Sequence, residues 1–265
     1  PQRFSSWFAG RPLGVTAPTR GRVLLWPDTF VNNFDPAVGQ AAVAVLEAAG
    51  FEVEVPRRTV CCGLTWISTG QLGVATRVLR RTLSALRPAL RSGTPVVVLE
   101  PSCAAVFRSD LPELLYDDTD AHRLADQTYT LGDLLADRAP DWKPPRVSAG
   151  TTDATQAIVQ QHCHQHALLG YTHERDLLAG AGVHADVLDA GCCGLAGNFG
   201  FENGHYDVSV ACAEDKLLPA LRDADPGTLV ISDGFSCRTQ IRELASGRHP
   251  VHTAQVLARA LPPPG

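Results

Sequence analysis

Residues 22–139 alternate between short apolar runs and longer segments in which apolar residues recur every three or four positions. Short apolar runs predict buried strands, and the longer spacing predicts helices with one buried face. Strands are predicted at 22–26, 51–56 and within 94–103, and helices at 37–50, 70–91 and 124–137. The first half of the chain therefore predicts strands that alternate with helices.

The second half repeats this order of elements. Strands are predicted within 155–163, 183–191 and 227–237, and helices at 166–182, about 204–222 and around 252–261. Equivalent positions keep a nearly constant offset: 131 residues from Cys61 to Cys192, and 134 residues both from Cys103 to Cys237 and from Thr29 to Cys163. An internal duplication is the simplest explanation of such regular spacing.

This pattern predicts an α/β fold. Alternating strands and helices favour two repeated α/β units, each with a mostly parallel sheet flanked by helices. We expect the two units to be related by pseudo-two-fold symmetry. The predicted parts are a linker-like N-terminal segment at 1–21, a first repeat at 22–139, a proline-rich linker at 140–155 and a second repeat at 156–265.

Composition narrows the function classes. The net charge of −5 disfavours a general nucleic-acid binder. No apolar run approaches the roughly 18 residues of a membrane span, and residues 1–14 lack the apolar core of a signal peptide. We therefore expect a cytoplasmic protein, with peripheral attachment to the inner face of the cell membrane as the alternative. The chain contains no methionine, which predicts that it is trimmed or part of a longer polypeptide.

The chain has eight cysteines, and a disulfide framework fits them poorly. The chain is large, shows no export signal and twice places two cysteines side by side, which makes awkward disulfide partners. Every cysteine except Cys212 follows a predicted strand by a few residues. The carboxyl ends of parallel strands share one edge of a sheet, so these thiols should converge there. The candidate ligands in the second half are Cys163, Cys192, Cys193 and Cys237.

Four converging thiolates suit an iron–sulfur cluster or a zinc ion. The alternative is that each cysteine is a small buried hydrophobic residue, which is our interpretation of Cys212. Glycines around the second cysteine pair support a ligand role. Gly191 and Gly194 let the backbone bend so that both side chains face one point, and Gly197 and Gly200 leave room for a bulky cofactor.

The first half offers three thiols in the same pattern: Cys61, Cys62 and Cys103. Thr29 stands where Cys163 stands in the second half. Three thiolates can hold a cluster or metal with one open or oxygen-ligated position, or they can be a relic of the duplication.

Several other residues lie near the predicted strand ends. His162, His164 and His166 surround Cys163, and histidine can ligate metals, donate hydrogen bonds or move protons. Alternating residues of a strand point to opposite sides, so we do not expect all three histidines to face one site. Arg238 follows Cys237 and either balances the charge of a cluster or lies on the surface. No Ser-His-Asp signature and no GxGxxG motif is present, so no catalytic residue is assigned.

These motifs resemble the CCG, or cysteine-rich, domain, which occurs as tandem pairs in heterodisulfide reductase and in the iron–sulfur subunits of glycolate oxidase, lactate utilisation systems and anaerobic glycerol-3-phosphate dehydrogenase. The resemblance covers residues 22 to about 245. The family pattern is a cysteine, then CCG, then CxxC. The matching positions are Thr29, CCG at 61–63 and EPSC at 100–103, then Cys163, CCG at 192–194 and GFSC at 234–237.

Two departures from the pattern matter. Glu100 and Gly234 replace the first cysteine of CxxC in the two repeats. Because the fifth cysteine is missing from both halves, disulfide reduction is not carried over to this chain. The resemblance implies one ordinary four-iron cluster, or zinc, in the second repeat.

The resemblance leads to two hypotheses about function. The sequences around 26–36, 188–202 and 232–241 look closest to the C-terminal part of fused D-lactate or D-2-hydroxyacid dehydrogenases. This implies an iron–sulfur module that passes electrons from FAD, bound in an upstream domain of the same polypeptide or complex, through a ferredoxin-like segment to a quinone or other acceptor. The alternative is a zinc-stabilised docking or scaffold domain without redox activity.

Overall fold

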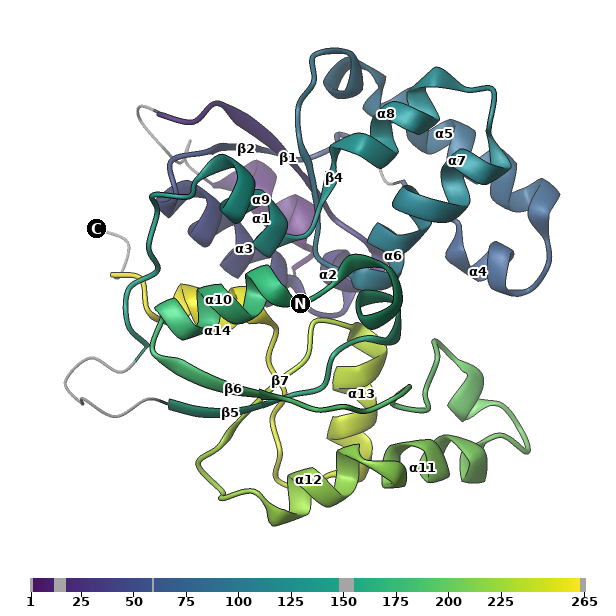
Figure 1. Ribbon diagram of the computed structural model, residues 1–265. Helices are drawn as coiled ribbons and strands as arrows, with labels where there is room; N and C mark the ends of the chain where they lie inside the picture. The colour runs from purple at the N-terminus through teal and green to yellow at the C-terminus, as the bar shows by residue number, and fades with distance from the viewer. Residues whose placement is uncertain (1, 12–17, 59, 148–154, 263–265) are drawn as a thin grey trace. The chain divides into compact units, whose positions relative to one another are not determined.

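The computed structural model describes residues 2–11, 18–58, 60–147 and 155–262. The chain divides into two compact units, Pro1–Trp142 and Lys143–Gly265. Each unit contains a parallel sheet flanked by helices, which confirms the predicted α/β class (Figure 1). The pseudo-two-fold relation between the units stays a prediction. Of the predicted linker at 140–155, residues 148–154 lie outside the described residues.

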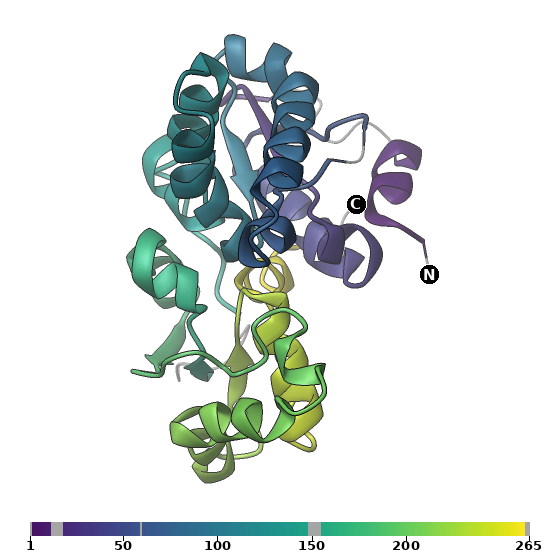
Figure 2. The same ribbon diagram turned by 90° about the vertical axis from the view of Figure 1, so that its right-hand side faces the viewer.

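Unit 1 is built on a four-stranded parallel sheet in the order β2-β1-β3-β4. Its strands are β1 (Arg22–Trp26), β2 (Glu52–Glu54), β3 (Val96–Val98) and β4 (Thr128–Tyr129). Helices cover both faces of this sheet (Figure 2). The helices are α1 (Phe4–Gly10), α2 (Thr29–Asn33), α3 (Pro36–Ala48), α4 (Leu64–Ser68), α5 (Leu72–Arg91), α6 (Pro101–Ala105), the π-helical turn Val106–Asp110, α7 (Leu111–Leu114), α8 (Thr119–Gln127) and α9 (Leu131–Arg138).

The core of unit 1 follows from the periodicity of its helices. Helix α5 buries one face, made by Ala75, Leu79, Leu83, Leu86 and Leu90, whose spacing of three or four residues matches the turn of a helix. Strand β1 is almost completely buried, as expected for the centre of a parallel sheet. Because β1 is central, the polar residues that follow it lie between the ends of β2 and β3.

Unit 2 has a three-stranded parallel sheet in the order β6-β5-β7, which repeats the order β2-β1-β3. Its strands are β5 (Thr155–Val159), β6 (Val183–Val187) and β7 (Leu229–Ile231). Helices α10 and α14 lie on one side of this sheet, and α11 to α13 lie on the other (Figure 1). The helices are α10 (Thr172–Gly180), α11 (Tyr206–Asp215), α12 (Leu217–Asp223), α13 (Phe235–Leu244) and α14 (Thr253–Arg259), with a π-helical turn at Gln165–Leu169 and a 3-10 turn at Phe199–Phe201.

Alternating side chains of β5 and β7 divide the core of unit 2 into two clusters. Val159 and Ile231 pack with Tyr171 and the helices on one side. Ile158 and Val230 pack on the other side in a cluster that also contains Cys193 and Cys237. Two of the predicted ligands are therefore anchored in the hydrophobic core, at the end of the sheet where the strands terminate.

Three predicted helices are interrupted. The segment 124–137 is divided by β4, because Thr130 caps the new helix α9 through a hydrogen bond from the Asp133 N–H to its hydroxyl. The segment 166–182 breaks at Gly170, which has a φ of 82°. The segment 204–222 divides into α11 and α12 at Lys216. Turn chemistry and tertiary packing outweigh helix periodicity at these positions.

Residues 4–10, within the predicted linker-like segment, form helix α1. Phe4 is fully buried, and the Ser5 N–H donates a hydrogen bond of 3.0 Å to the side-chain oxygen of Asn32. This helix is therefore an integral part of unit 1. Among the described residues, no helix has both the length and the apolar character needed to span a membrane.

Candidate metal centre

Unit 2 places its four predicted ligands just beyond the ends of its three strands. Cys163 follows β5, Cys192 and Cys193 follow β6, and Cys237 lies in the first turn of α13, which follows β7. Cys193 and Cys237 are buried, whereas Cys163 and Cys192 are exposed, and all four are free thiols. The edge of the sheet therefore presents two thiols anchored in the core and two that face outward.

The four thiols are neighbours, since Cys192 is hydrogen-bonded to Cys163 and Cys193, and Cys193 is hydrogen-bonded to Cys237. Hydrogen bonds with Cys163 and Cys193 lower the pKa of Cys192 to about 2, although partial burial opposes this shift. The hydrogen bond with Cys192 raises the pKa of Cys163, and desolvation and the charges of Cys192 and Cys237 raise it further. Hydrogen bonds with Cys192 and Cys237 raise the pKa of Cys193. The structure thus brings together residues that lie up to 74 positions apart in the sequence.

Both CCG turns have the same local geometry. Gly63 and Gly194 adopt left-handed backbone conformations with φ of 85° and 96°. In each turn the glycine N–H donates to the first thiol, at 3.4 Å from the sulfur of Cys61 or of Cys192. The backbone N–H of the next residue donates to the second thiol of the pair. Each turn therefore directs backbone donors at two sulfurs, an arrangement that stabilises thiolates.

The glycine-rich loop has a different role from the one the sequence predicts at Gly200. A side chain at this position would meet Leu195 and overlap the side chain of Ser209. The space is thus filled by a close contact with helix α11 rather than left open for a cofactor. Gly191 and Gly197 have no heavy atom within 4 Å of an added side-chain carbon among the described residues, so open space borders the loop there.

Two histidines lie against Cys163. Its sulfur is 3.9 Å from Nδ1 of His162 and 3.7 Å from Nδ1 of His164, and the two rings stack with centroids 5.3 Å apart. Potential ligand atoms of these three residues all lie within 4.8 Å of one another. The strand ends at Val159 and a helical turn begins at Cys163, so residues 162 and 164 do not alternate as they would in a strand, which explains how both rings reach one side. His166 is exposed.

His162 fills the space beside Gly234, the position that replaces a cysteine of the family pattern. A Cβ atom at 234 would overlap Cδ2 of His162 and lie 3.2 Å from its Nε2. Gly234 itself has an ordinary φ of −76°, so the backbone alone does not require glycine. Position 234 has no side chain because the buried imidazole of His162 occupies the space that a side chain would need.

We expect Gly234→Ala to destabilise unit 2 by roughly 1–3 kcal/mol, because the added methyl group displaces the His162 ring from its packed position. In a His162→Ala background the same change should cost much less, since the overlapping atoms are gone. Thermal unfolding followed by circular dichroism of the two single variants and the double variant measures this coupling. Additive effects would contradict the assignment of this contact.

Unit 1 brings its three thiols together in a different arrangement. Sγ of Cys103, in the first turn of α6, lies 2.9 Å from Sγ of Cys62, and both residues are buried. The hydrogen bond with Cys62 lowers the pKa of Cys103, but desolvation and the nearby carboxylates of Asp28 and Glu100 outweigh it and raise the pKa to about 11. The hydrogen bond with Cys62 and desolvation raise the pKa of Cys61. Thr29, which takes the place of a fourth thiol, is exposed.

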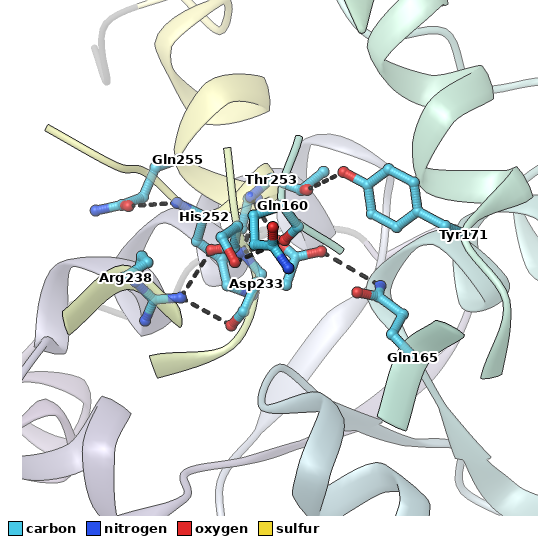
Figure 3. Close-up of polar contacts among 10 residues, drawn as sticks. Gln160, Gln165, Tyr171, Asp233, Arg238, His252, Thr253 and Gln255 are labelled. Atoms are coloured by element: carbon cyan, nitrogen blue, oxygen red, sulfur yellow. Dashed lines mark hydrogen bonds and ion pairs between the residues drawn. The ribbon is translucent and has the colours of Figure 1, made fainter. Parts of the chain in front are cut away.

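The sequence did not reveal a network of buried polar groups in the segments that follow β5 and β7 (Figure 3). Arg238 is 1% exposed, and its Nη1 donates to the carbonyl oxygens of Ser232 and Asp233, at 3.0 and 2.7 Å. The surface interpretation of this arginine is therefore wrong. Asp233 in turn accepts a hydrogen bond from the Thr253 N–H at 2.8 Å. These bonds fix the loop that leads from β7 into the helix carrying Cys237.

Gln160 links this network to the CCG turn. Its Nε2 donates to the carbonyl oxygen of Gly191 at 3.2 Å, and its own carbonyl accepts from the Ser232 hydroxyl at 2.8 Å. One residue at the end of the central strand therefore connects the loops that follow β6 and β7. The sequence feature that could have indicated this network is the fully polar segment QQH, directly after a buried strand.

Comparison with known proteins gives consistent matches. A family model described as a cysteine-rich domain, CCG, matches residues 28–108. The chain is 31% identical over 228 residues to lactate utilization protein A of Bacillus velezensis, an alignment covering 79% of this chain and 89% of the relative. It is 27% identical over 254 residues to a subunit of the anaerobic glycerol-3-phosphate dehydrogenase of Escherichia coli K12, covering 92% of this chain but only 60% of that relative.

Proposed function

Because this chain belongs to the family of cysteine-rich CCG proteins that includes lactate utilization protein A, we propose that it is an iron–sulfur electron-transfer module of an oxidoreductase. The observation that carries this proposal is the convergence of Cys163, Cys192, Cys193 and Cys237 at one edge of unit 2. Such a module supplies ligands and electrostatics, while the cofactor supplies the redox chemistry.

The four thiols fit the proposed cofactor. The donor set consists of sulfur alone, and four cysteine thiolates are the usual ligands of a four-iron cluster. Bound there, the cluster would accept and release single electrons. Backbone N–H groups of the CCG turn donate to two of the sulfurs, and hydrogen bonds of this kind adjust the reduction potential. Cys193 and Cys237 hold the buried side of the site in the hydrophobic core.

His162, His164 and Arg238 would surround the site without ligating the cluster. The two imidazoles lie against Cys163 on the outer side. Arg238 places a buried cation one residue after Cys237, and its charge would offset that of an anionic cluster. In this proposal Thr29 does not contribute to the cluster site of unit 2, because it belongs to unit 1.

At a finer level, we propose that electrons come from a flavin that oxidises a D-2-hydroxy acid of the lactate or glycolate type. The flavin and a ferredoxin-like segment would belong to other domains of the same polypeptide or complex, and a quinone would be one acceptor. Two findings support this assignment. One relative is named for lactate utilisation, and another is named as one subunit of a dehydrogenase.

The zinc-stabilised docking domain is the second candidate. It is favoured by the grouping of His162, Cys163 and His164, whose nitrogen and sulfur atoms lie within 4.8 Å of one another. Nitrogen and sulfur ligands together are typical of zinc.

Anaerobic isolation of the chain separates the two candidates. We expect about four iron and four sulfide per chain, with broad visible absorption that bleaches on reduction by dithionite. Stoichiometric zinc without colour would support the docking domain and contradict the electron-transfer module. For the finer proposal, the complete polypeptide or complex isolated from its source should show the same bleaching on addition of D-lactate or glycolate. L-lactate serves as the matched control, and bleaching by neither D-lactate nor glycolate would exclude this substrate class.

A further inference from the structure

Unit 1 contains a buried pair of thiols whose geometry differs from that of a metal site. Cys103 donates a hydrogen bond to Cys62, with the sulfurs 2.9 Å apart, and each residue is 6% exposed. The two residues are 41 positions apart in the sequence. Cys62 is the second cysteine of the CCG turn, and Cys103 lies in the first turn of α6. The contact therefore joins the loop after β2 to helix α6, which follows β3.

The distance between the sulfurs is short for two ligands of one metal ion. Two thiolates bound to tetrahedral zinc, at Zn–S distances of about 2.3 Å, lie roughly 3.8 Å apart. A disulfide bond is about 2.05 Å long, so the sulfurs need to approach by only about 0.9 Å to form one. The two sulfurs would have to move apart to bind one metal ion, whereas only a small approach is needed to form a disulfide.

The charges around the pair favour a neutral product. Glu100 is 4% exposed and Asp28 is 2% exposed, and both carboxylates lie near Cys103. Asp28 accepts backbone hydrogen bonds from Phe30 and Val31, and Glu100 accepts one from the Ser102 hydroxyl, so both acids are held in place. An anionic metal–thiolate centre would add further negative charge here, whereas a disulfide adds none.

We propose that Cys62 and Cys103 form a reversible dithiol–disulfide couple that reacts with small-molecule disulfides. One thiol of the pair, as its thiolate, attacks a sulfur of the small disulfide, forms a mixed disulfide and releases one small thiol. The second thiol then attacks the mixed disulfide at the protein sulfur and releases the other small thiol. The protein loses two electrons and two protons, and the small disulfide gains both. Burial restricts the reaction to small partners, because each cysteine is only 6% exposed.

The proposal does not depend on the cofactor of unit 2, and peptide mapping tests it directly. The full chain is incubated anaerobically with mixtures of glutathione and glutathione disulfide, alkylated and digested with trypsin without reduction. We expect a cross-link between the peptides 59–77 and 92–108, which contain Cys61, Cys62 and Cys103, and its loss on addition of dithiothreitol. Oxidation should also raise the unfolding temperature of unit 1, since the cross-link closes a long loop.

Three variants identify the reacting pair. Cys61→Ser removes the ambiguity within peptide 59–77 and should keep the cross-link, whereas Cys62→Ser and Cys103→Ser should lose it. Absence of the cross-link in the wild-type chain at every glutathione ratio would overturn the proposal. A cross-link that requires Cys61 would overturn the assignment of the pair. A metal ion that wild-type unit 1 retains and Cys103→Ser loses would show a ligand role instead.

Discussion

Cys192→Ser is expected to abolish metal binding by unit 2 completely. Cys192 is the central member of the thiol chain, because it interacts with Cys163 on one side and with Cys193 on the other. A serine hydroxyl is a poor ligand for iron in a cluster and for zinc, since both prefer soft thiolates. Iron, sulfide and zinc analysis of anaerobically purified protein, together with the visible spectrum, measures the effect.

Cys212→Ser is the matched control for this experiment. Cys212 is an exposed thiol in α11 of the same unit, and it takes no part in the interactions among the four predicted ligands. We expect its metal content and spectrum to equal those of the unmodified chain. Full metal occupancy in Cys192→Ser would show that the ligand set is wrong, and equal losses in both variants would point to general damage from cysteine removal.

Gly194→Ala should have the second large effect, a loss of unit 2 stability of about 3 kcal/mol or more. The left-handed φ of 96° alone costs an alanine roughly 1–2 kcal/mol. The added Cβ would also overlap the backbone oxygen of Ser209, and overpacking of this kind typically adds roughly 1–3 kcal/mol. Ser209 cannot move away easily, because Gln240 donates hydrogen bonds to both its carbonyl and its hydroxyl.

Gly63→Ala, the equivalent change in unit 1, provides the comparison. Gly63 has a similar φ of 85°, but the nearest atom to an added Cβ is Cγ of Leu79 at 3.5 Å, an ordinary contact. This variant should therefore lose only the roughly 1–2 kcal/mol of backbone strain. The difference between the two variants isolates the contact with Ser209.

The positions of the tryptophans allow the units to be followed separately. Trp7, Trp26, Trp66 and Trp142, the four tryptophans of the chain, all belong to unit 1. Denaturation followed by tryptophan fluorescence should detect Gly63→Ala and miss Gly194→Ala, whereas circular dichroism should detect both. Equal destabilisation by the two changes would contradict the role assigned to the Ser209 contact.

The sequence by itself determined the order of the strands β1 to β3 and β5 to β7 and the positions of the thiols after them. Short apolar runs indicated the strands, because residues at the centre of a parallel sheet are buried on both faces. The rule that parallel strands share one carboxyl edge then predicted that Cys163, Cys192, Cys193 and Cys237 would meet. The paired glycines of the CCG turns followed from local backbone geometry, since only glycine adopts those φ values without strain.

Only the tertiary structure decided which atoms fill the space around the thiols. The contact of His162 with Gly234 and the hydrogen bond from Gln160 to Gly191 join segments far apart in the chain, and no local pattern encodes their distances. Tertiary contacts also explain why the thiols of the two units are arranged differently. Their CCG turns match in sequence and in backbone geometry, yet unit 1 places two sulfurs 2.9 Å apart beside buried carboxylates. The difference in sulfur geometry comes from side chains outside the CCG turns, because those side chains determine the charge and the packing around the thiols of each unit.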